Sequence, residues 1–139
     1  MLPVDILLVE DNPADVYLAQ SHLEALEPAP QVHVAGDGPS ALEFLRAQSR
    51  AGNQRPRLVV LDLNLPGMSG HEVLSHIRED DELGHLPVMI LSTSTARSDV
   101  EAAYQGHANA YVAKPEDLDG YERIVDGIGR FWLETATLP

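Results

Sequence analysis

The fold is decided by the stretch Leu58-Val59-Val60-Leu61-Asp62-Leu63-Asn64-Leu65-Pro66-Gly67-Met68-Ser69-Gly70. Its first four residues are apolar, which is typical of a strand buried on both faces of a parallel sheet. Asp62 follows at the carboxyl end of this strand, and a Pro-Gly turn then leads to a helix start. Open α/β sheets bind ligands at that end of their strands, so Asp62 is the first candidate site residue. Taken alone, a capping or turn aspartate is the simpler explanation.

Four other segments are also predicted to be strands: Val4–Val9, Val32–Ala35, Leu86–Leu91 and Ala110–Ala113. Together with the central stretch they alternate with five amphipathic helices, which predicts a doubly wound, five-stranded parallel sheet of the flavodoxin-like (βα)5 kind. The three most apolar strands are expected at the centre and the two short ones at the edges. Right-handed crossovers then allow the strand order 2-1-3-4-5.

The helix boundaries are predicted from capping residues. Four starts are indicated by Asn12 before Pro13, by Asp37, by Ser69 with Glu72, and by Ser98 with Glu101. A polar loop is expected from Ser49 to Pro56. The last helix is expected to bury one face, made of Leu118, Tyr121, Val125, Ile128 and Trp132.

The composition describes an ordinary globular chain of one domain, residues 1–139, with a core over about 3–134 and a short C-terminal tail. Of the 139 residues 44% are apolar and none is cysteine, so disulfides and thiolate metal sites are excluded. The net charge of −13 argues against a nucleic-acid partner and favours a basic partner surface. Residues 1–4 read as the start of structure rather than a signal peptide, and no apolar run is long enough to span a membrane. A cytoplasmic location is expected.

The predicted strand order gathers several polar side chains at one edge of the sheet. Glu10, Asp11 and Asp62 end neighbouring strands, and Ser92 and Lys114 end the next two on the same side. Carboxylates this close need a cation between them at neutral pH, and oxygen ligands without His or Cys favour Mg²⁺. A carboxylate beside such an ion can attack a phosphoryl group and become an aspartyl phosphate. The Lys114 ammonium and the Ser92 hydroxyl can donate hydrogen bonds to the remaining phosphoryl oxygens.

The chain resembles a known family over essentially its whole length. The matching motifs are Glu10-Asp11, the stretch 62–70, Pro87–Ser92 and Tyr111–Pro115. They are those of the receiver domain of two-component response regulators, the CheY-like proteins. The resemblance implies that Asp62 is the phosphoacceptor, served by a histidine kinase or a histidine phosphotransfer protein.

The resemblance also implies roles for the surrounding residues. Asp11 and Asp62 are the direct Mg²⁺ ligands, with the backbone carbonyl of Asn64 as a third protein ligand. Glu10 stands where aspartate is commoner and would hold the ion through water. Lys114 is the phosphate-binding lysine, and the peptide bond before Pro115 is expected to be cis.

A conformational switch follows from the same resemblance. Ser92 is the switch hydroxyl, with Thr93 as the runner-up, and Tyr111 is the switch aromatic. For Tyr111 the alternative is a half-buried aromatic of an edge strand. Phosphate on Asp62 is expected to draw Ser92 toward it, let Tyr111 turn inward, and alter the face made by the fourth helix, fifth strand and fifth helix.

The end of the chain bears on its output and its partners. About five residues follow the last predicted helix, so a stand-alone receiver without a DNA-binding domain is expected, with no enzymatic activity beyond its own phosphorylation and slow dephosphorylation. The apolar residues 131–133 are expected to serve the core and a homodimer contact, core alone being the alternative. The segments 10–15 and 92–94 are similar to single-domain regulators paired with phytochrome-like photoreceptor kinases.

Four other functions are conceivable for a chain with this predicted fold. A phosphatase of the haloacid-dehalogenase type needs a second aspartate where Asn64 stands, and no P-loop motif occurs. A flavodoxin-like cofactor binder needs a phosphate-cradling loop where Glu10-Asp11 stand. The alternative kept open is a receiver-like interaction module that works without phosphorylation. No metal is assigned to the six histidines.

Overall fold

The computed structural model describes residues 5–52 and 56–137, so Val4 at the start of the first predicted strand lies outside it, as do residues 53–55 of the predicted loop. The strands are β1 (Asp5–Val9), β2 (Gln31–Ala35), β3 (Leu58–Leu61), β4 (Val88–Ser92) and β5 (Ala110–Ala113). The helices are α1 (Pro13–Glu24), α2 (Gly38–Arg50), α3 (Gly70–Glu79), α4 (Arg97–Gln105) and α5 (Leu118–Ile128), and a π-helix, η1 (Gly129–Thr135), continues α5.

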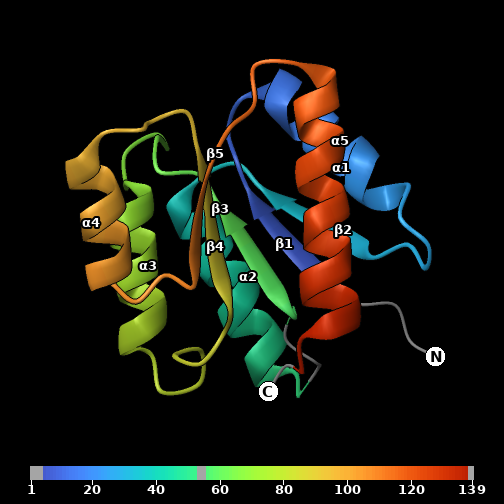
Figure 1. Cartoon of the computed structure of the whole chain (residues 1–139). Coiled ribbons are helices and arrows are strands. Elements are labelled where there is room, and N and C mark those ends of the chain that lie inside the picture. Colours follow the sequence, from blue (N-terminus) through green and yellow to red (C-terminus); the bar gives the residue numbers. More distant parts are fainter. Residues whose placement is uncertain (1–4, 53–55, 138–139) are drawn as a thin grey trace.

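All neighbouring strands are parallel, and their order is β2-β1-β3-β4-β5 (Figure 1). The predicted α/β fold and strand order are therefore confirmed. The register pairs Val9 with both Ala35 and Leu61, and Ser92 with Ala113. Leu61 pairs with Ile90, so β4 extends two residues beyond β3. Because all the strands are parallel, the residues that follow them meet at one edge of the sheet.

Two apolar layers hold the sheet between its helices. One layer packs the sheet against α2, α3 and α4, and the other packs it against α1 and α5, as Figure 1 shows. The four residues of β3 are all buried, as are those of β4, which agrees with their place inside the sheet. This packing fixes the strand ends that carry the polar residues.

Three of the four predicted helix caps are confirmed. Asn12 accepts the N–H groups of residues 14 and 15, Asp37 accepts that of Ser40, and the Ser69 hydroxyl accepts that of Glu72. The prediction for Ser98 was wrong, because the N-terminal cap position is Ala96, two residues earlier, and it provides no side-chain cap.

The start of α4 is stabilised differently. The Ser94 hydroxyl accepts the N–H of Ala96, and Arg97 pairs with Glu101 one turn later. A capping-box spacing therefore occurs inside the helix, where it has no capping role, because the hydroxyl that precedes the helix lies at Ser94.

The last helix departs from its predicted face at both ends. Leu118 is 60% exposed, because it lies in the first turn of α5, whereas Tyr121, Val125 and Ile128 are buried as expected. After Ile128 the turns widen into η1, which ends the 3.6-residue period on which the prediction depended. Trp132 still packs against the layer of α1 and α5.

Two more features of the chain bear on the predictions. The helix α2 continues to Arg50, so the polar loop expected from Ser49 starts later.

Within the described residues, no helix has the length and apolar character that a bilayer crossing requires.

Candidate functional site

Two buried carboxylates lie at the carboxyl edge of the sheet. The N–H of Glu10 donates to the carbonyl of Ala35, and the N–H of Asp62 donates to that of Val9, both at 3.0 Å. The backbone of both acids therefore continues the parallel ladder. Their exposed fractions are 4% for Glu10 and 5% for Asp62. A buried charge needs a compensating partner, so we expect a cation beside these two carboxylates.

A third carboxylate completes an acidic cluster. Glu10, Asp11 and Asp62 each offer one oxygen, and these three oxygens lie within 4.8 Å of one another. Asp11 is exposed, which leaves the cluster open to water on one side. Carboxylate oxygens with room for water are the surroundings that hard divalent cations prefer. The residues therefore fit a divalent metal site.

The carboxyl group of Glu10 is already engaged on both oxygens. One oxygen accepts the N–H groups of Asp11 and Asn12 at 3.0 and 3.2 Å, and the other bonds to Lys114. Burial raises the pKa of Glu10 to about 7, although the hydrogen bond from Lys114 acts in the opposite direction. Asp11, the one exposed acid of the three, is consequently the most accessible ligand of the cluster.

Lys114 supplies the positive charge of the crevice. Its Nζ contacts Glu10, Asp15 at 3.0 Å and Asp62 at 3.1 Å, and its side chain is only 6% exposed. Burial alone would lower the pKa of Lys114, but the hydrogen bonds to Glu10 and Asp15 and the charge of Asp62 raise it above its usual value. The ammonium therefore stays charged and links four elements of the fold.

The loop after β3 places Asp62 against the start of α3. An oxygen of Asp62 accepts the N–H of Asn64 at 3.3 Å, and the N–H of Gly70 donates to the carbonyl of Leu63. A side chain at Gly70 would bring its Cβ to 2.2 Å from the carbonyl oxygen of Asp62. This close approach requires glycine, because any Cβ would push the phosphoacceptor candidate out of place.

The hydroxyl candidates differ in where they lie. Ser92 is fully buried at the end of β4, and its carbonyl accepts the N–H of Lys114 at 2.8 Å, whereas Thr93 is exposed. The Ser92 hydroxyl accepts the N–H of Ser94 at 3.2 Å. Ser92 therefore lies between the crevice and the loop that leads to α4.

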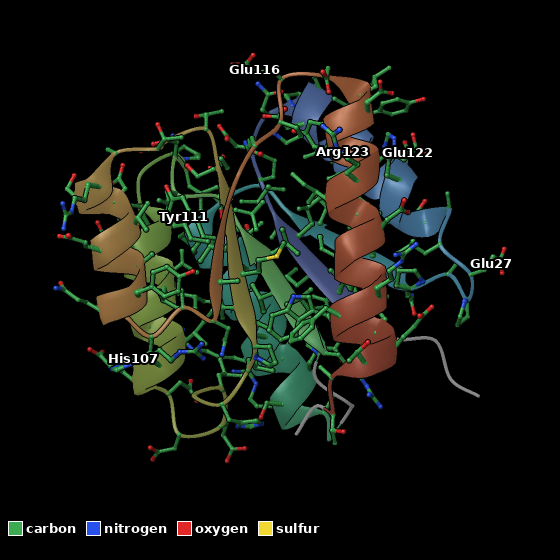
Figure 2. All side chains as sticks on the ribbon, viewed as in Figure 1. Glu27, His107, Tyr111, Glu116, Glu122 and Arg123 are labelled. Carbon is green, nitrogen blue, oxygen red and sulfur yellow. The ribbon has the colours of Figure 1, made fainter. Side chains whose placement is uncertain are left out.

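Tyr111 lies on the same side, between β5 and α4, as Figure 2 shows. Its hydroxyl donates to the carbonyl of Ser94 at 2.7 Å, and its N–H donates to the hydroxyl of Tyr104 at 3.1 Å. The Ser94 hydroxyl in turn donates to Asp99, which also contacts His71. Ser94 thus joins the Ser92 hydroxyl, Tyr111 and the start of α4.

The structure adds two residues that the sequence reasoning missed. Asp15, in the first turn of α1, contacts Lys114 with one oxygen and accepts the hydroxyl of Tyr121 with the other at 3.2 Å. The helix start predicted at Asn12 and Pro13 puts Asp15 in the first turn, near Glu10 and Asp11, and that place was the available signal. Tyr121 carried no such signal, because its place in an apolar stripe explains its aromatic ring but not its hydroxyl.

The expected isomer of one peptide bond was wrong. Among the described residues the cis peptide bond joins Glu27 to Pro28, and the bond from Lys114 to Pro115 is trans. The two isomers of a bond before proline differ by only about 1 kcal/mol. The residue types therefore do not decide the isomer, which depends on the surrounding chain.

The chain was compared with known families and proteins. The family described as the response regulator receiver domain matches residues 6–126. The response regulator Rcp1 of Synechocystis sp. is 43% identical over 138 residues, which cover 99% of this chain and 94% of that protein.

Two solved structures are similar over almost the entire chain. The phosphorylated cyanobacterial phytochrome response regulator RcpA superposes with a TM-score of 0.91 at 43% identity, covering 99% of both chains. The Mn²⁺-bound form of Rcp1 superposes with a TM-score of 0.89 at 42% identity, also covering 99% of both chains. Both likenesses span the crevice and the helices on the two sides of the sheet.

Proposed function

The chain belongs to the response regulator receiver family, and from this membership we propose that it accepts a phosphoryl group on Asp62 from a histidine kinase or a histidine phosphotransfer protein. The observation that carries the proposal is the place of Lys114, whose Nζ lies 3.1 Å from Asp62 beside the cluster of Glu10, Asp11 and Asp62. A carboxylate nucleophile, cation-binding oxygens and a fixed ammonium thus share one crevice.

In the proposed reaction an oxygen of Asp62 forms the new P–O bond, while the P–N bond of the donor's phosphohistidine breaks. Lys114 stays charged, and its ammonium is placed to bond a phosphoryl oxygen beside Asp62. The chain turns over only its own phosphoryl group, so its role is that of a regulator rather than an enzyme acting on other substrates. The proposed receiver unit comprises residues 1–139.

The divalent cation proposed for the crevice is Mg²⁺. Asp11 and Asp62 would hold it directly, the Asn64 carbonyl would be a third ligand, and Glu10 would act through water. When bound, the ion would supply positive charge that stabilises the negative charge of the phosphoryl group. The open side of the cluster at Asp11 suits an ion that keeps several waters.

The proposed output is a shift between two conformations of the α4–β5–α5 face. A phosphoryl group on Asp62 would draw in the Ser92 hydroxyl, which now accepts the N–H of Ser94. Ser94 also holds the Tyr111 hydroxyl through its carbonyl, so a move of this loop releases the ring. Thr93, which is exposed, is the less suitable switch hydroxyl.

The proposed kinase partner is a phytochrome-like photoreceptor histidine kinase. The support is the likeness to RcpA, which is named a phytochrome response regulator, at 43% identity over 99% of both chains.

We also propose a homodimer that uses Phe131, which is 54% exposed beside Trp132. The net charge of −13 excludes a nucleic-acid partner from the proposal, and the location proposed is the cytoplasm.

The proposed function is tested by intact-mass spectrometry. Wild-type protein incubated with a small acyl-phosphate donor and Mg²⁺ is expected to gain the mass of one phosphoryl group. Asp62→Asn is expected to gain none, because the amide is not a nucleophile for phosphorus. Equal labelling of Asp62→Asn would place the acceptor elsewhere, and no labelling of either protein would leave an interaction module that works without phosphorylation.

Size-exclusion chromatography with light scattering, before and after phosphorylation, tests the dimer.

A further inference from the structure

The ammonium of Lys114 has all three of its N–H donors engaged, and one of them bonds to a residue outside the proposed phosphorylation chemistry. Its acceptors are carboxylates on three different segments: Glu10, Asp15 and Asp62. Glu10 and Asp62 belong to the acidic cluster, but Asp15 lies in the first turn of α1. Asp15 therefore determines where the third donor points.

Asp15 also connects the crevice to α5. Its second oxygen accepts the hydroxyl of Tyr121 at 3.2 Å, and the ring of Tyr121 is buried at 4% exposure in the layer of α1 and α5. Burial raises the pKa of Tyr121 to about 12, and the charge of Asp15 acts in the same direction. The hydroxyl consequently remains a donor to Asp15. Lys114, Asp15 and Tyr121 thus form a continuous chain of hydrogen bonds.

We propose that Asp15 is a positioning residue that holds the Lys114 ammonium and transmits its displacement to Tyr121 of α5. The inference rests on the proposed function, since the displacement is the one that a phosphoryl group on Asp62 would cause. Such a group adds negative charge of about −1.5 to −2 and accepting oxygens next to Nζ. A donor that turns toward these oxygens weakens the Lys114–Asp15 bond. Asp15 then bonds more closely to Tyr121, and the environment of the phenol changes.

Fluorine NMR of protein labelled with 3-fluorotyrosine tests this directly. The chain has four tyrosines, and the line of Tyr121 is identified by its loss in Tyr121→Phe. Beryllofluoride with Mg²⁺ serves as the phosphoryl mimic. In wild-type protein the lines of Tyr111 and Tyr121 are both expected to shift. In Asp15→Ala the Tyr111 line still shifts, whereas the shift of Tyr121 falls by more than half.

A second variant distinguishes loss of the charge of Asp15 from loss of its whole side chain. Asp15→Asn keeps the shape and one accepting oxygen but removes the charge, so an intermediate Tyr121 shift is expected. Asp119→Ala, which removes an exposed acid from the same helix as Tyr121, is the matched control and is expected to behave like wild type. Both Asp15 variants should still bind beryllofluoride, several-fold more weakly, because Glu10 and Asp62 continue to hold Lys114.

The outcomes separate this inference from the proposed function. A full Tyr121 shift in Asp15→Ala, or a wild-type response limited to Tyr111, would overturn the link to α5 alone. Complete loss of beryllofluoride binding in both Asp15 variants would also overturn it, because Asp15 would then belong to the binding site itself. If wild-type protein neither binds beryllofluoride nor takes up a phosphoryl group, the proposed function fails and the inference fails with it.

Discussion

Two hydrogen-bond networks leave the crevice, one toward α5 and the other toward α4, and they differ in charge and exposure. The network toward α5 runs from Lys114 through Asp15 to Tyr121, and its central ammonium is 6% exposed. The network toward α4 runs from Ser92 through Ser94 to Asp99, where the side chains of Asp99 and His71 are 39% and 31% exposed. The first depends on buried charge, whereas the second joins neutral hydroxyl and backbone groups to a partly exposed carboxylate.

This difference indicates that the α5 side of the crevice is held more firmly than the α4 side. Separating a buried ammonium from its carboxylates costs several kcal/mol unless another anion takes their place. A hydrogen bond between neutral groups, such as that from the Ser94 N–H to the Ser92 hydroxyl, contributes only about 1 kcal/mol. The α5 side should therefore change only when an anion arrives, whereas the loop before α4 can rearrange more freely.

The largest effect is expected from removal of the buried cation. Lys114→Met should lower the free energy of unfolding of the metal-free protein by about 3 kcal/mol, because Glu10 and Asp62 lose their compensating charge. The raised pKa of Glu10 limits the loss, since this carboxyl group can take up a proton. Urea denaturation measures the change, and added Mg²⁺ should restore part of it.

Arg97→Met is the control for this variant. Its ion pair with Glu101 is exposed, the arginine side chain at 92%, so its removal should cost less than about 0.5 kcal/mol. Equal losses in the two variants would show that the buried charge of Lys114 has no special role.

A smaller effect is expected on the α4 side. Ser92→Ala should cost about 1 kcal/mol in urea denaturation, because the N–H of Ser94 loses its acceptor. Phosphoryl uptake should persist, but the fluorine signal of Tyr111 should no longer respond to beryllofluoride. Thr93→Ala, at the exposed neighbouring hydroxyl, is the control, and a lost Tyr111 response there instead would make Thr93 the switch hydroxyl.

The smallest effect concerns pH. The hydroxyl of Ser94, and after it the contact with His71, lowers the pKa of Asp99 from its usual 3.8. A carboxyl group whose pKa is lower in the folded protein stabilises the fold above its unfolded-state pKa and loses that effect as the pH falls through the folded-state value.

Thermal unfolding should therefore show Asp99→Asn slightly less stable than wild type at neutral pH. The difference should shrink when the pH is taken below 3.8. A difference that grew on acidification would mean that Asp99 is protonated in the folded protein, against the direction of its pKa shift.

The sequence predicted the sheet because its signals are local and repeated. Four apolar residues before Asp62, and the comparable runs before Glu10 and Ser92, each indicate a buried strand on their own. Right-handed crossovers then leave few possible orders. The convergence of Glu10, Asp11 and Asp62 follows from that order, since parallel strands end at the same edge.

The hydrogen bond that was missed depends on residues distant in sequence, whereas the errors in α4 and α5 are local. The hydrogen bond from Tyr121 to Asp15 spans 106 positions, and no local pattern indicates it. The cap predicted at Ser98 was wrong because the helix already begins at Arg97, after the loop in which Ser94 bonds the N–H of Ala96. Of the face predicted for α5, Trp132 packs as expected although the helix type changes after Ile128, whereas Leu118 is exposed.

The shared cation site of Asp11 and Asp62 is tested most directly by titrating the protein with Mg²⁺ in a calorimeter. Wild-type protein is expected to bind one ion, Asp11→Asn and Asp62→Asn should each bind it about tenfold more weakly or worse, and Asp99→Asn should bind it like wild type. Unchanged affinity in Asp11→Asn or in Asp62→Asn would contradict a single ion held between these two carboxylates.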